Sequence, residues 1–145
     1  MENKSAGDSM NQIINLIQQK FGDSCQFCSP LEETQYDYAK RILPIDLFEI
    51  LTISNGIKEL MTHPYANNGT LFVIDSIIYS FDEILSETET FSELFSIEGI
   101  VFAGNGAGGF YIIKPDETIY LYEFVGEEGE YCAENLKEYF SNYIF

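Results

Sequence analysis

The sequence has no tryptophan, a single histidine, His63, and only 7 lysines and arginines against 24 acidic residues. Its apolar runs are much shorter than the roughly 20 residues that a membrane-spanning helix needs, and its start does not resemble a signal peptide. A net charge of −17 repels the phosphates of nucleic acids and of anionic lipids. We therefore expect a cytoplasmic protein that binds neither nucleic acid nor membrane directly.

Residues suited to catalysis or metal binding are also scarce. An odd cysteine count argues against a disulfide framework, and the Cys25 and Cys28 pair would need two further ligands to hold zinc. His63 precedes Pro64 in a loop-like segment, which favours a surface histidine over a catalytic one. We predict no catalytic residue, no metal and no cofactor, and the role of the cysteine pair stays open.

The acidic charge is unevenly distributed along the chain. Residues 82–145 carry 14 acids and 2 bases, net −12, whereas residues 1–81 carry 10 acids and 5 bases, net −5. Such a field attracts a basic protein partner. The alternative is that acidity only keeps the protein soluble.

The length of 145 residues is typical of one domain. We expect a flexible start over residues 1–8 and one domain over residues 9–145. Capping-box spacings predict helices that begin near Ser9, Ser29 and Ser80. A further helix begins at Pro44 and ends at the turn residues Asn55 and Gly56, and the closing helix begins near Leu136.

Short apolar runs predict strands between these helices. They cover residues 71–74, 77–79, 100–103, 110–113 and 119–125. Asp75-Ser76 is predicted to form a turn between the first two runs. Asn67-Asn68-Gly69 is predicted to form a loop tip. Since the later connections are short, the fold class is α+β, with a mainly antiparallel sheet and flanking helices.

The segment from Gly104 to Gly109 matches the G-x-G-x-x-G pattern of dinucleotide-binding proteins. That pattern requires a helix after the last glycine, but a strand-like run follows here. We therefore interpret Gly104, Gly106, Gly108 and Gly109 as a structural turn in which at least one glycine has a positive φ.

Aromatic residues in the last predicted strand suggest recognition. Tyr120 and Tyr122 share one face of that strand. Tyrosines on an open face beside acids resemble an interface that combines aromatic anchors with charge steering. The alternative is a central strand covered on both faces. The predicted partner-binding residues are Glu87, Glu89, Glu93, Asp116, Glu117, Tyr120, Tyr122, Glu127, Glu128 and Glu130.

Three segments together resemble the SUKH superfamily. They are Leu43-Pro44-Ile45-Asp46-Leu47-Phe48 leading to Asn55-Gly56, Phe102-Ala103-Gly104-Asn105-Gly106, and Ile119-Tyr120. The resemblance rests on their order and spacing and covers roughly Ser29 to Phe145. The absence of tryptophan departs from the family and leaves details of the sheet surface open.

The resemblance implies a single α+β domain, no catalytic residues and a binding role. Bacterial members resemble immunity proteins that neutralise polymorphic toxins, often nucleases, whereas fungal relatives regulate cell-wall glucan synthesis and others act as adaptors. Two hypotheses follow: an immunity protein that binds a basic toxin domain, and a regulatory adaptor. The sequence leaves the partner's identity and the oligomeric state open.

Overall fold

The structure is a computed structural model of the chain and describes residues 6–62 and 71–143. In chain order its elements are α1 (Ala6–Phe21), β1 (Cys25–Phe27), α2 (Glu33–Ile42), α3 (Ile45–Ile53), β2 (Ile57–Thr62), β3 (Leu71–Ile78), α4 (Phe81–Phe95), β4 (Ile100–Gly104), β5 (Phe110–Ile113), β6 (Ile119–Tyr122), β7 (Glu130–Ala133) and α5 (Leu136–Glu138). A 3-10 turn, Gly22–Ser24, follows α1, and a π-helical turn, η2 (Tyr139–Tyr143), continues α5. No helix within the described ranges is both long and apolar enough to cross a membrane.

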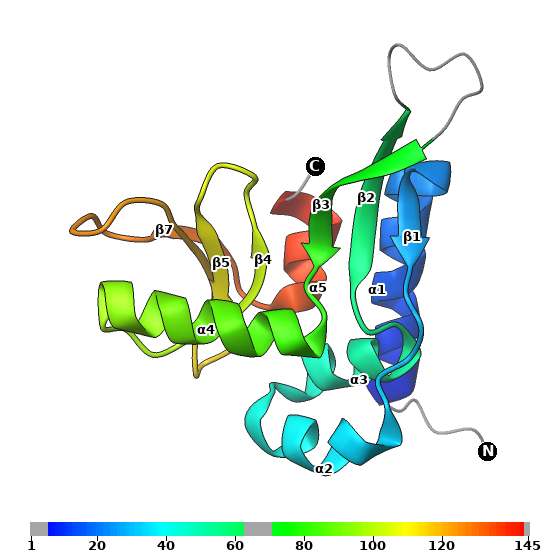
Figure 1. Cartoon of the computed structure of the whole chain (residues 1–145), viewed down its shortest axis with the longest axis horizontal. Helices are drawn as coiled ribbons and strands as arrows, with labels where there is room; N and C mark the ends of the chain where they lie inside the picture. Colours follow the sequence, from blue (N-terminus) through cyan, green and yellow to red (C-terminus); the bar gives the residue numbers. More distant parts are fainter. Residues whose placement is uncertain (1–5, 63–70, 144–145) are drawn as a thin grey trace.

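The described strands form two antiparallel sheets. One has the order β1-β2-β3 and the other β4-β5-β6-β7. The predicted α+β class with antiparallel strands is confirmed, although the strands divide between two sheets instead of forming one. Figure 1 shows α4 lying across the four-stranded sheet, α1 beside the three-stranded sheet, and α2 and α3 together at one end of the molecule.

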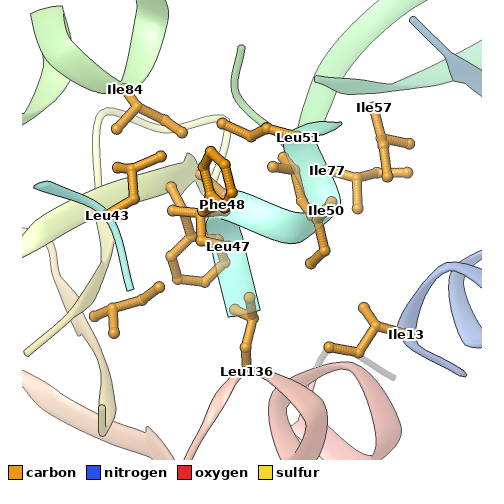
Figure 2. Packing of buried hydrophobic residues seen from close by; sticks show 14 of the residues in the cluster. Ile13, Leu43, Leu47, Phe48, Ile50, Leu51, Ile57, Ile77, Ile84 and Leu136 are labelled. Carbon is orange, nitrogen blue, oxygen red and sulfur yellow. The ribbon is translucent and has the colours of Figure 1, made fainter. Parts of the chain in front are cut away.

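The main core gathers around α3, whose Leu47, Ile50 and Leu51 are fully buried. Figure 2 shows Ile13 of α1 and Leu136 of α5 approaching these side chains from other elements. Residues from both sheets belong to the same buried cluster, among them Ile57, Ile77, Phe102, Ile113 and Ile119. The two sheets therefore share one core, which fits a single small domain.

The start of α4 confirms the capping box predicted at Ser80. The Ser80 hydroxyl accepts a hydrogen bond from the Glu83 N–H at 3.3 Å, and the Glu83 carboxylate accepts one from the Ser80 N–H at 2.9 Å. Asn55 supports the same helix end, because its side-chain oxygen accepts from the Phe81 N–H at 2.8 Å. Gly56, which follows, has a φ of +105°.

The other two predicted capping boxes are wrong. Helix α1 already begins at Ala6, so Ser9 lies inside the helix, as do residues 6–8 of the predicted flexible start. Helix α2 begins only at Glu33, because the Ser29 carbonyl accepts a hydrogen bond from the Asn55 N–H at 2.8 Å. This contact ties Ser29 to the chain that follows α3 instead of leaving it to cap α2.

The strand predictions need three corrections. Asp75 and Ser76 lie inside the continuous strand β3, where they pair with Glu59 and Lys58 of β2 between two register shifts, and do not form a turn. Strands β1, β2 and β7 were not predicted, because their residues lack a clear alternation. The last predicted strand ends at Tyr122, not at residue 125. The predicted loop tip Asn67-Asn68-Gly69 and His63 lie outside the described residues.

Candidate protein-binding surface

A recess of about 610 Å³ lies on the four-stranded sheet beside the end of α4. Tyr120 and Tyr122 alternate with buried Ile119 and Leu121 along β6, so both tyrosines point to the side that α4 covers. The recess is lined by Ile97, Lys114, Tyr120, Tyr122, Gly126, Glu127, Glu128, Gly129 and Tyr131.

Aromatic rings form the floor of this recess. The Lys114 ammonium nitrogen lies 3.9 Å from the centre of the Tyr120 ring, a favourable cation–π contact. The Tyr131 ring meets Tyr120 at 5.6 Å between ring centres and an angle of 80°. Tyr131 is 50% exposed. Two neighbouring strands thus present one half-open aromatic patch.

Tyr122 has a different environment from the one predicted. It is only 4% exposed, and its ring packs against Phe91 and Phe95 of α4, at 5.3 and 5.4 Å between ring centres. A Cβ atom on Gly129 would collide with the same ring. The assignment of Tyr122 to partner binding is therefore corrected: its ring belongs to the small core beneath α4.

The loop between β6 and β7 carries two exposed apolar residues. Phe124 and Val125 are 65% and 62% exposed, although the sequence placed them in a strand. Figure 1 shows this loop projecting from the left side of the molecule, away from the three-stranded sheet. Gly126 in the same loop has a φ of +92°, which an extended strand does not adopt. The glycine at this position is the feature of the sequence that could have indicated a loop.

The predicted acidic residues do not form one continuous surface. Glu127 and Glu128 line the recess, and exposed Glu130 begins β7. Glu87, Glu89 and Glu93 lie on α4. Asp116 and Glu117 lie in the β5–β6 turn, which is at the opposite sheet end from the β6–β7 loop because successive hairpins alternate ends.

Asp116 has a local structural role in its turn. Its carboxylate accepts hydrogen bonds from the Thr118 hydroxyl at 2.6 Å and from the Thr118 N–H at 3.1 Å. These bonds hold the pKa of Asp116 below its ordinary value. Glu117 next to it has a φ of +76°, so both residues help to shape the turn.

Two acids that sequence reasoning missed lie near the recess. Partial desolvation, followed by the charges of Glu138 and Glu134, raises the pKa of Tyr131 above its ordinary value of 10.0. Glu134 follows β7, and Glu138 ends α5. Their negative charge adds to that of Glu127 and Glu128 near Tyr131, while Lys114 places a positive charge over Tyr120.

The glycine-rich segment forms the β4–β5 loop and is followed directly by a strand. Gly106 and Gly108 have φ values of +76° and +89°. The Asn105 side-chain oxygen accepts hydrogen bonds from the Ala107 and Gly109 N–H groups at 2.9 and 2.8 Å. Its amide nitrogen donates to Glu123 at 3.0 Å. The loop is therefore tied to the root of the β6–β7 loop.

Few other groups in the described residues are suited to metal binding or catalysis. Across residues 6–62 and 71–143, no group of three or more His, Cys, Asp or Glu side chains is placed to hold a metal ion. No disulfide joins Cys25, Cys28 or Cys132 within the described residues. Comparison with known proteins gives no matching family and no curated protein of significant similarity.

The geometry therefore gives one coherent surface with an apolar and aromatic centre and acidic surroundings. We call it the β6–β7 surface and define it by Tyr120, Phe124, Val125, Glu127, Glu128 and Tyr131. Buried aromatic anchors inside a polar rim are the arrangement from which protein interfaces draw most of their binding energy.

Proposed function

We propose that this chain is a non-enzymatic binding protein that neutralises a toxin domain by covering the toxin's basic surface. The observation that carries the proposal is the β6–β7 surface, where exposed Phe124, Val125 and Tyr131 stand beside Glu127 and Glu128. The resemblance of the sequence to SUKH immunity proteins supports the same function.

The acidic side chains and the apolar side chains of this surface contribute to binding in different ways. A nuclease toxin must be basic where it holds phosphate, so a folded acidic protein over that region blocks the substrate without chemistry of its own. The exposed acids accelerate association by long-range attraction. Phe124, Val125 and Tyr131 supply the area that leaves water on binding and therefore slow dissociation.

The experiment measures binding of the purified chain to any toxin domain encoded by a neighbouring gene. Reversing Glu127 and Glu128 to lysine should lower the association rate constant about tenfold at low salt, and the difference should shrink at high salt. The matched control reverses Glu32 and Glu33, another adjacent and exposed pair. The control changes the net charge equally and should alter the rate less than twofold.

A second pair of variants tests the aromatic centre. Tyr131→Ala should raise the dissociation rate constant about tenfold, whereas Tyr38→Ala, at 47% exposure on α2, should leave it unchanged. Co-expression of the chain should also restore the growth of cells that make the toxin. Absence of binding, with a neighbouring operon for cell-wall synthesis instead of a toxin, would favour the regulatory adaptor.

A further inference from the structure

Asn105 and Gly106 form an Asn-Gly pair in the β4–β5 loop, which is drawn in yellow in Figure 1. Asparagine is a chemically labile residue. In such a pair the glycine nitrogen can attack the carbonyl carbon of the asparagine side chain, because glycine has no Cβ to hinder the approach. Asn55 and Gly56 form a second pair, and a third, at residues 68–69, lies outside the described residues. The first two pairs place the same reacting groups in two different environments.

The attacking nitrogen is more available in the first pair than in the second. Gly106 is exposed, and its N–H donates no hydrogen bond within the described residues. Gly56 is buried, and its N–H donates to the Ser54 carbonyl at 2.8 Å. Attack by the Gly56 nitrogen would therefore break a hydrogen bond in a buried position, which costs free energy. Attack by the Gly106 nitrogen breaks no such bond.

The carbonyl group of the Asn105 side chain is also activated for attack. Its oxygen accepts hydrogen bonds from the Ala107 and Gly109 N–H groups at 2.9 and 2.8 Å. Attack turns this oxygen into an oxyanion, and two backbone donors at such distances stabilise the charge that develops on it. The same bonds hold the side chain over the residues that follow it, which is the side from which the attack comes. The Asn55 side-chain oxygen accepts only one N–H, that of Phe81.

We propose that Asn105 is a site of spontaneous deamidation. The Gly106 nitrogen forms a bond to Cγ of Asn105, and its proton passes through water to the side-chain nitrogen. The bond between Cγ and Nδ2 then breaks and releases ammonia. Water opens the resulting cyclic imide at either carbonyl and leaves an aspartyl or an isoaspartyl residue. The reaction needs only water, so the proposal goes beyond the proposed function and does not depend on a partner.

Deamidation would remove the contact that joins the β4–β5 loop to the start of the β6–β7 loop. The Asn105 side-chain nitrogen donates to the Glu123 carboxylate at 3.0 Å. After the reaction a second carboxylate stands where this donor was, and two like charges in one site repel each other. The isoaspartyl product also lengthens the main chain by one carbon atom. We expect the β6–β7 loop to open more often in both products.

The first test is peptide mapping by mass spectrometry of the full chain after incubation at mildly alkaline pH, both folded and in concentrated urea. Dividing each folded rate by the rate of the same residue in urea cancels the effect of local sequence. This ratio should be at least about tenfold higher for Asn105 than for Asn55, because only Asn105 has an available nitrogen and two donors for the oxyanion. Equal ratios would overturn the proposal. So would an aspartyl product without isoaspartate, which shows direct hydrolysis without attack by Gly106.

The second test examines the effect on the loop. Asn105→Asp reproduces the charge of one product, and hydrogen exchange over residues 124–129 should become about tenfold faster than in wild type. Asn105→Asp/Glu123→Gln exchanges donor and acceptor and should restore the slow exchange. The control Gln18→Glu, exposed on α1, changes the net charge equally and should leave exchange in the loop unchanged. If Asn105→Asp also left it unchanged, deamidation would not open the loop, and that consequence would be wrong.

Discussion

Two tyrosines on one face of the four-stranded sheet have opposite environments. Tyr122 is 4% exposed beneath α4, whereas Tyr131 on the neighbouring strand is 50% exposed. The boundary between them follows the end of α4, where Ser96 takes a left-handed conformation with a φ of +56°. The end of a helix can therefore divide a single sheet face into a buried half and an exposed half.

Removing the ring of Tyr122 and that of Tyr131 in turn tests this difference most directly. Tyr122→Ala should lower the free energy of unfolding by about 3 kcal/mol, because it leaves a cavity among Phe91, Phe95 and Phe110. Tyr131→Ala should change stability by less than about 0.5 kcal/mol. Urea titrations of both variants give the two values. Equal losses would mean that the face is not divided.

A smaller effect is expected where the β6–β7 loop crosses the Tyr122 ring. Gly129→Ala should cost about 2 kcal/mol, because the added Cβ collides with a ring that is held on its other sides. Gly126→Ala has open space but a φ of +92°, and should cost only about 1 kcal/mol. Thermal unfolding compares the two. A Gly129→Ala chain as stable as wild type would show that the loop can lift away from the ring.

Helix α4, which covers Tyr122, can be destabilised at its N-terminal capping box. Ser80→Ala removes the side-chain acceptor for the Glu83 N–H and should destabilise the chain by about 1 kcal/mol. Hydrogen exchange should show faster opening of α4 while α3 is unaffected. Ser92→Ala, exposed near the other end of α4, is the control and should remain within about 0.5 kcal/mol of wild type.

The smallest expected effect is a pH dependence of stability that arises from Glu83, the other member of this capping box. Burial raises the pKa of Glu83, but hydrogen bonds from Ser80 and Lys58 outweigh it and hold the pKa below the ordinary 4.5. The stabilisation by ionised Glu83 is thus fully present above about pH 4.5 and is lost as the pH falls through the lowered folded-state pKa.

Glu83→Gln should therefore be less stable than wild type near pH 7, with a difference that shrinks at about pH 3.5. Thermal unfolding at both pH values measures this, with Glu89→Gln on the same helix as control. A difference that stays constant with pH would assign the contribution of Glu83 to packing and not to its charge.

Features with strong local signals could be predicted from the sequence. Helix α4 follows from Ser80, Glu83 and the apolar spacing after them, and α3 follows from Pro44 and the Asn55-Gly56 stop. The strand-loop-strand character of the glycine-rich segment follows from the residues after it. In each case the deciding interactions lie within a few positions along the chain.

Features set by distant contacts could not be predicted. Alternation in β6 places Tyr120 and Tyr122 on one face, but only the docking of α4 determines that Tyr122 is buried. Leu94 lies three residues after buried Phe91 on α4, a helical spacing that favours burial, yet it is 48% exposed. Strand β2 is specified by its pairing with β3, since its own sequence, Ile57 to Thr62, mixes charged and apolar residues without alternation.

The Asn105 side chain affects how much conformational entropy the β6–β7 loop can lose on binding. By bonding Ala107, Gly109 and Glu123 together, it fixes the start of the β6–β7 loop before any partner arrives. A loop that is already ordered at its root loses less conformational freedom on binding, so more of the contact energy remains as affinity. Under the proposed function, Asn105 would thus increase the affinity of the complex by ordering the loop in the free protein.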